Sequence, residues 1–198
     1  MTHILAFSDL HHSRSRADVL VQESASADLV IGAGDFANHR QNVPEAMNLL
    51  FGIKKPFVVV PGNNESDQEL RDAAHAGTTV LHGQFEEIAG VRVFGIGCGV
   101  PLTPWTEWSF DLTEDAARSL LANCPEVDIL ITHSPPKGAV DRSSGGLSLG
   151  SLAVREAIER VKPRLVLCGH VHECWGVEEM IGPSRVCNLG PTPNWFDF

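Results

Sequence analysis

The chain has 198 residues, 43% of them hydrophobic and 20% charged, a composition typical of globular proteins. Its 15 basic and 25 acidic residues give a formal net charge of −10, which argues against a long nucleic acid as partner. No apolar run reaches the ~18 residues of a membrane span, and the N-terminus lacks the pattern of a signal peptide. We therefore expect one cytoplasmic domain covering residues 1–198.

The cysteines argue against a disulfide framework. There are five of them, an odd number, and no two stand in a CxxC pair that would indicate a zinc site. We expect them to be small buried hydrophobic residues. They are Cys98, Cys124, Cys168, Cys174 and Cys187.

The first 77 residues alternate between short apolar runs and amphipathic stretches, in the order strand, helix, strand, helix, strand, helix. Continuous apolar strands of this kind are typical of a parallel sheet that is buried on both faces. Ser66 suits the N-cap of the third helix, and Gly77 suits its end. The expected strands cover residues 2–9, 27–35 and 56–63, and the expected helices 13–26, 43–53 and 65–77.

The second part of the chain predicts a second sheet. Residues 78–97 indicate antiparallel strands around a turn near Gly90, and a loop rich in Pro and Trp follows. We therefore expect an α/β fold of two packed sheets flanked by helices, with the aromatic tail either folded onto the core or contacting another subunit. The later expected elements are helices 113–123 and 151–163, strands 127–136 and 164–173, and a hairpin turning at Gly182–Pro183.

Polar residues gather just after the expected strands, where open α/β sheets place their sites. Four histidines, two aspartates and one asparagine at these points offer seven metal ligands. In an extended chain residues i and i+2 point the same way, so we expect Asp9 with His11, and His170 with His172, each to reach one small volume. The seven are Asp9, His11, Asp35, Asn63, His133, His170 and His172.

The donor set indicates which metals fit. Imidazole mixed with carboxylate and no thiolate suits Mn, Fe, Zn, Co or Ni better than Mg or Ca, which prefer oxygen. Seven ligands are too many for one tetrahedral ion. They suit two divalent ions that share one bridging carboxylate.

The motif order DxH, GD, GNxE, TH and GHxH resembles the calcineurin-like metallophosphoesterase superfamily, from Asp9 to about Pro191. The later half most resembles the small Icc-related prokaryotic phosphoesterases. The resemblance implies a two-sheet β-sandwich flanked by helices, the αββα metallophosphoesterase fold, and two divalent metal ions, with manganese favoured. It assigns Asp9, His11 and His172 to one ion, assigns Asn63, His133 and His170 to the other, and makes Asp35 the bridge.

One position departs from the family pattern. The family usually reads GNH followed by an acid, and that histidine is its proposed general acid, whereas this chain has Asn64 there. A carboxamide can donate a hydrogen bond to a phosphoryl oxygen but cannot deliver a proton near pH 7. We therefore expect poor activity on alkyl leaving groups, unless His12 or His39 acts as the acid.

The function that these residues favour is a phosphodiesterase that hydrolyses small phosphodiesters by in-line attack of a metal-bridging hydroxide. A phosphomonoesterase and a low-activity, protein-binding scaffold are the alternatives. Arg142, in the glycine-rich loop 137–150, is a candidate phosphate contact. Trp105 and Trp108 either wall the cleft or, as we prefer, pack in the core. The expected partner is a small phosphoester, and self-association is left open.

Overall fold

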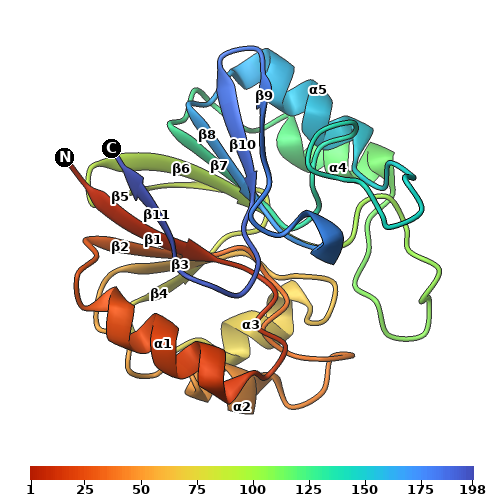
Figure 1. The fold of residues 1–198 in the computed structure, drawn as a ribbon. Helices are drawn as coiled ribbons and strands as arrows, with labels where there is room; N and C mark the ends of the chain where they lie inside the picture. The colour runs from red at the N-terminus through yellow and green to blue at the C-terminus, as the bar shows by residue number, and fades with distance from the viewer.

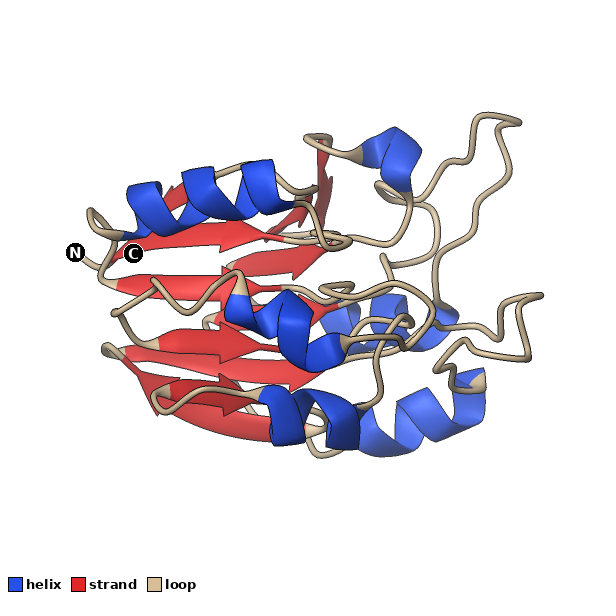
Figure 2. Cartoon of the chain, turned by 90° about the horizontal axis from the view of Figure 1, so that it is seen from below, coloured by secondary structure: helices blue, strands red, loops and turns tan.

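The computed structural model describes residues 1–198 and contains two β-sheets that pack face to face between layers of helices (Figures 1 and 2). Three helices cover the first sheet and two cover the second, which gives the order helix, sheet, sheet, helix. The predicted α/β fold of two sheets flanked by helices is confirmed. None of the helices is both long and apolar enough to cross a membrane.

The first sheet contains the N-terminal strands and, at its edge, the last strand of the chain. Its strands lie in the order β11-β1-β2-β3-β4, and all neighbours are parallel except β11, which runs antiparallel to β1. The aromatic tail therefore folds onto the chain's own core. The elements are β1 (His3–Phe7), β2 (Leu29–Gly32), β3 (Phe57–Val59), β4 (Thr78–Val80), β11 (Asn194–Asp197), α1 (Arg14–Ser24), α2 (Val43–Asn48) and α3 (Asp67–Ala73).

The second sheet has the order β5-β6-β7-β8-β10-β9. Its four central strands are parallel neighbours, and antiparallel hairpins close both edges. The elements are β5 (Gln84–Ile88), β6 (Val91–Ile96), β7 (Ile129–Thr132), β8 (Leu165–Cys168), β9 (Glu178–Ile181), β10 (Ser184–Asn188), α4 (Glu114–Leu121), α5 (Leu152–Val161) and the short 3-10 helix η1 (His172–Cys174).

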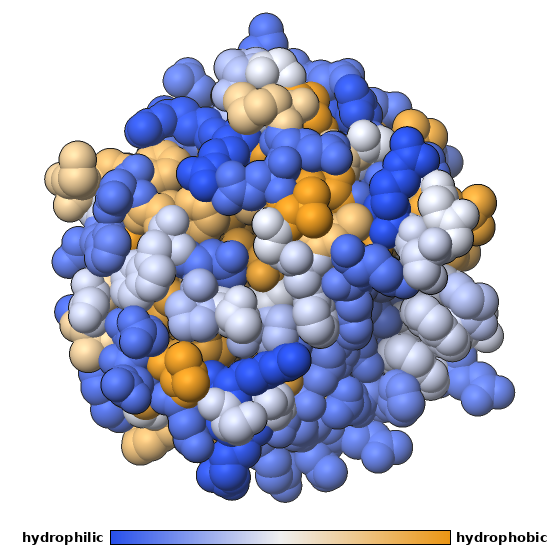
Figure 3. Space-filling view, viewed as in Figure 1, coloured by the Kyte–Doolittle hydropathy of each residue, from blue (hydrophilic) through white to orange (hydrophobic).

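The strand pleat divides the apolar residues among three layers. On β1, Ile4 and Ala6 face the second sheet, whereas Leu5 and Phe7 face the helices that cover the first sheet. A third cluster packs the second sheet against α4 and α5. The molecular face in Figure 3 shows apolar residues as separate small patches among hydrophilic ones, since most of the apolar surface is inside these layers.

Several predicted boundaries differ from the structure, as where helix 43–53 ends at Asn48 and strand 164–173 at Cys168, and two other differences have a clear cause. The third helix ends at Ala73 rather than at Gly77, because Ala74 already has extended backbone angles and Gly77, with φ +91°, turns the chain into β4. Residues Thr78–Val80 pair in parallel with β3, so only the remainder of the expected antiparallel segment forms the hairpin β5–β6. The predicted N-cap is present, since Ser66 accepts a hydrogen bond from the Glu69 N–H.

The edge strand β11 should contribute to stability through Phe196, which is buried between the sheets. We expect Phe196→Ala to lower the free energy of unfolding by about 3 kcal/mol, because it leaves a cavity in this layer. Urea denaturation measures the change. The matched control is Phe85→Ala on the exposed face of β5, where Phe85 is 43% exposed and the cost should be below about 1 kcal/mol. Equal losses in the two variants would contradict the packing described here.

Candidate metal centre

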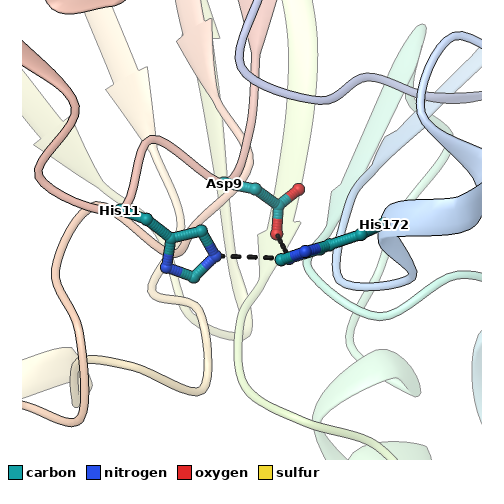
Figure 4. A group of neighbouring side chains, drawn as sticks. All are labelled: Asp9, His11 and His172. Carbon is teal, nitrogen blue, oxygen red and sulfur yellow. Dashed lines mark hydrogen bonds and ion pairs between the residues drawn. The ribbon is translucent and has the colours of Figure 1, made fainter.

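Two groups of potential metal ligands lie where the parallel strands of both sheets end. In the first group the ligand atoms of Asp9, His11 and His172 all lie within 4.8 Å of one another (Figure 4). The second group meets the same limit and contains Asp35, His133 and His170. Each group combines side chains from both sheets, so the centre depends on how the two sheets pack.

Asp35 lies between the two groups. Its Oδ2 is 3.6 Å from Nε2 of His11, and its Oδ1 is 3.4 Å from Nε2 of His133. Each carboxylate oxygen therefore faces a histidine of a different group. A carboxylate with one oxygen toward each group could be shared by two cations.

Around the second group, several hydrogen-bond acceptor atoms face one another. His133 Nδ1 is 2.8 Å from the Ala33 carbonyl oxygen, which can only accept, so Nδ1 carries the proton and a neutral ring has a bare Nε2. That Nε2 lies 3.2 Å from Oδ1 of Asn63 and 3.2 Å from Nδ1 of His170. Acceptors this close repel one another unless a proton or a cation lies among them.

The first group has the same arrangement. The Asn38 amide nitrogen donates to the His11 backbone oxygen at 3.4 Å, so Asn38 Oδ1 accepts from His11 Nδ1 at 2.9 Å. His11 Nε2 is then the free electron pair, and it lies 3.3 Å from Nε2 of His172. Asp9 Oδ1 is 3.6 Å from that same His172 nitrogen. The donor set of both groups therefore fits two divalent cations, with Asp35 shared between them.

The pKa values reflect these close contacts. Burial opposes ionisation of Asp9 and Asp35, but the neighbouring histidines outweigh it and hold both pKa values below the usual range. Burial also disfavours a charged His133, but the charge of Asp35 raises its pKa to about 9. Burial and His133 lower the pKa of His170 to about 4. The carboxylates thus favour positive charge at the place where the ligand atoms converge, and a cation bound there would compete with protons for these ligands.

The backbone at the site is unusual. Four of the seven predicted ligands have positive φ angles: 54° at Asp9, 48° at His11, 60° at Asp35 and 69° at His170. The expectation that extended chain brings Asp9 and His11 together is therefore wrong, although both do reach the first group. His170 and His172 do line one cavity, in different ligand groups, although His170 with its positive φ is not extended. Strained conformations of this kind persist only where the surrounding structure imposes them.

Glu65 supplies part of that constraint, and we did not predict it. Its buried carboxylate accepts the backbone N–H groups of Asp35 at 2.8 Å, Gly62 at 2.7 Å and Ala37 at 3.1 Å. It thereby ties the loop after β2 to the loop after β3. Burial and the charge of Asp35 raise the pKa of Glu65 to about 7. A side chain at Gly62 would overlap Asp35, so glycine is required where these loops meet. The acid of GNxE was the available sequence signal for Glu65.

Trp175 is a second residue that the sequence did not indicate. Its indole Nε1 donates to Oδ2 of Asp9 at 3.2 Å, and the Ser8 hydroxyl donates to the same oxygen. Its ring lies against the His172 ring, with a centroid distance of 4.3 Å. Trp175 and Ser8 both bind Oδ2, and the other oxygen of Asp9, Oδ1, therefore faces His172.

A chain of hydrogen bonds fixes the amide of Asn63. Its Nδ2 donates to Oγ of Ser109 at 3.0 Å, and the Ser109 hydroxyl donates to Oδ1 of Asp111 at 2.7 Å. Because Asp111 accepts the Ser109 proton, the Ser109 oxygen can accept from Asn63. The Asn63 oxygen is then turned toward His133 and His170.

Asn64, the position that departs from the family pattern, braces two loops. Its Nδ2 donates to Oδ2 of Asp35 at 2.7 Å, and its Oδ1 accepts the His39 N–H at 2.7 Å. Both ends of the carboxamide thus have partners within the chain. A contact from Asn64 to a phosphoryl oxygen stays a prediction.

The other predicted site residues lie at different distances from the centre. A cavity of about 750 Å³ opens beside the ligands, and His39 lines it together with Asn64, Trp105 and Trp108. His12 does not line this cavity, and its Nε2 is 3.0 Å from the Gln41 carbonyl oxygen. Arg142 does not line it either, because its guanidinium donates to the Gly146 carbonyl within its own loop. Of the two candidate acids, His39 is the one that the structure places at the cavity.

Comparison with known sequences agrees with these motifs. Residues 2–174 match a sequence model of calcineurin-like phosphoesterases. Metallophosphoesterase domain-containing protein 1 of Homo sapiens is 36% identical over 124 residues, which cover 59% of this chain and 35% of that protein. The match thus spans about a third of the length of this relative (35%).

Comparison with solved structures supports the same fold. Protein TT1561 of Thermus thermophilus superposes with a TM-score of 0.75 at 19% identity, covering 99% of this chain and 98% of that one. A dimetal phosphatase from Danio rerio superposes with a TM-score of 0.66 at 12% identity, covering 96% and 88%. At these identities the likeness concerns the fold.

Removal of the Ser109 hydroxyl should weaken the second metal position. We expect Ser109→Ala to lower the affinity for one of two Mn²⁺ ions about tenfold, because the Asn63 amide loses the partner that orients it. Electron paramagnetic resonance during Mn²⁺ titration measures both affinities. Ser109→Thr keeps the hydroxyl and should restore binding, and Ser119→Ala on exposed α4 is the control. Unchanged Mn²⁺ binding in Ser109→Ala would contradict this role of the hydrogen-bond chain.

Proposed function

The chain belongs to the calcineurin-like phosphoesterase family, and we propose that it is a dinuclear metal-dependent phosphodiesterase acting on small phosphodiesters. Family membership and the two ligand groups support the broader activity, hydrolysis of phosphoesters with divalent metal ions. The observation that carries the proposal is the position of Asp35 between the two groups. Manganese is our proposed metal, with Fe, Zn, Co and Ni as alternatives that suit the same donors.

The residues of the centre have separate tasks in this proposal. Two divalent ions held here would activate a water molecule and neutralise charge on the phosphoryl oxygens. Asp35 keeps the two positions adjacent, and Glu65 fixes the backbone of Asp35. His133 and Asn63 keep their electron pairs directed inward through the hydrogen bonds on their outer sides.

The preference for diesters rests on Asn64. A carboxamide cannot protonate a leaving group, and loss of a general acid typically costs about 10²–10⁴-fold where protonation is needed. Leaving groups that depart as stable anions avoid this cost. His39 also lines the cavity, and its ring lies 4.3 Å from that of Trp108.

Two alternatives are weaker. A phosphomonoesterase would need a proton source for alkyl esters, which Asn64 does not provide. A scaffold that only binds partners has no need for the ligand side chains, yet all seven predicted positions carry them. A cytoplasmic location, a small phosphoester as partner and self-association stay predictions.

Hydrolysis of an aryl phosphodiester tests the proposal. We expect the Mn²⁺-dependent rate to fall more than about 100-fold in Asp35→Asn and in His133→Ala, because loss of partners outside the ligand shell alone costs about 10–100-fold. Release of p-nitrophenolate from bis(p-nitrophenyl) phosphate measures the rate. His3→Ala, at an exposed residue near the termini, is the control and should keep the rate. Equal rates in all four proteins would end the proposal.

The acid position can be tested by Asn64→His. A histidine here should raise kcat/KM for an alkyl phosphoester relative to an aryl one by at least about tenfold, because it supplies a proton to the poorer leaving group. The ratio of the two kcat/KM values is the readout, so general damage to the centre cancels. Asn123→His, on an exposed turn after α4, is the control. An unchanged ratio would show that Asn64 does not set leaving-group preference.

A further inference from the structure

Two tryptophans form one wall of the cavity beside the metal centre. Trp105 and Trp108 stack with a centroid distance of 5.7 Å and an interplanar angle of 17°. Both line the same cavity as His11, Asp35 and His170. Trp105 is 51% exposed, so the pair is not core packing, which was our preferred interpretation from the sequence.

An aliphatic side chain also lines the cavity. Leu149, from the loop after β7, lines the cavity and is 44% exposed. The lining of the cavity therefore combines residues of the ligand groups with apolar side chains. A small phosphoester with its phosphate at the ligand groups would have its substituent within reach of these apolar side chains.

The loop that carries the tryptophans is fixed to the metal centre. The Phe110 N–H donates to the backbone oxygen of Asn63 at 2.9 Å, and Ser109 holds the Asn63 amide. On the other side of the loop, Asp111 Oδ2 accepts the Thr103 N–H at 2.8 Å. These bonds hold the indoles at a set place relative to the ligand groups, so a substrate would meet a wall that is already formed.

We propose that Trp105 and Trp108 form a subsite for a flat aromatic ring on the phosphoester, either a nucleobase or an aryl group. This inference rests on the proposed function, since the metal centre anchors the phosphate. A stacked indole pair offers a flat π face to a ring, and base–aromatic stacking typically changes affinity by about tenfold or more. Of the two, an aryl group also agrees with Asn64, because a phenol-type leaving group departs without protonation, whereas a nucleoside leaves through an alkyl oxygen of its ribose.

Matched ligand pairs test the subsite through binding, and the first pair, two phosphonates, cannot be hydrolysed. Phenylphosphonate and cyclohexylphosphonate carry the same anion and rings of similar size, but only the phenyl ring is flat and aromatic. Adenosine 5′-monophosphate and ribose 5-phosphate form the second pair, which tests a nucleobase. Isothermal titration of the Mn²⁺-loaded protein should show the aromatic member of at least one pair binding about tenfold more tightly. The pair that shows the difference identifies the aromatic group that is preferred.

Variants then test whether the two tryptophans cause the difference in affinity. Trp105→Leu and Trp108→Leu should bring the affinity ratio within a pair close to one, while the affinity for the non-aromatic member stays the same. Trp108→Phe should keep part of the ratio because it retains a flat ring. Trp195→Phe, on the distant strand β11, is the control and should keep the full ratio.

The outcomes separate this inference from the proposed function. Equal affinities within both pairs, or no binding of either aromatic ligand, would overturn the subsite even if the protein hydrolyses phosphodiesters. A ratio that survives in both Trp→Leu variants would also overturn it. Tight aromatic binding that depends on the tryptophans, without hydrolysis of any ester, would support the subsite and contradict the proposed function.

Discussion

The arrangement of this site depends on a cluster of electron-pair donors that face one another. Nε2 of His133, Oδ1 of Asn63 and Nδ1 of His170 lie within 3.2 Å of each other. Outer hydrogen bonds direct two of these electron pairs inward, from the Ala33 carbonyl for His133 and from Ser109 for Asn63. Such a cluster needs a proton or a cation among its atoms. The metal-binding character thus follows from the hydrogen bonds around the ligands as much as from the ligands themselves.

Parallel strands explain how distant parts of the chain reach this cluster. The ends of β1, β2, β7 and β8 meet at one edge of the packed sheets (Figures 1 and 2). Strands alone do not orient the side chains, because the ligands follow the strands in loops and four of the seven have left-handed backbone. Glu65 holds the Asp35 loop in place, and the absence of a side chain at Gly62 lets the two loops approach. The strands therefore bring the ligand residues near one another, and a few buried polar contacts orient their side chains.

The contrast between strands and long-range polar contacts also explains which features the sequence could predict. The apolar runs and the polar residues after them predicted the two sheets and the edge where Asp9, Asp35 and His133 gather, because both patterns are local. The pairing of β4 with β3 was not predicted, since its residues alone do not distinguish a parallel partner from an antiparallel one. The contact of Trp175 with Asp9 joins residues 166 positions apart, and that of Ser109 with Asn63 joins residues 46 apart. Contacts of that kind are set by tertiary packing, which no local pattern records.

Asn64 connects the hydrogen bonds that hold Asp35 with the lack of a proton donor for the leaving group. Its amide holds Asp35 on one side and the His39 backbone on the other, two contacts that need a donor and an acceptor in one short neutral side chain. An imidazole has a donor and an acceptor too, but on a wider ring that also exchanges protons near neutral pH. An asparagine therefore strengthens the frame around the bridging carboxylate and gives up a proton source at the leaving group. The identity of the leaving group then matters more for the rate, and a ring bound by Trp105 and Trp108 would favour an ester whose leaving group is an aryl oxygen.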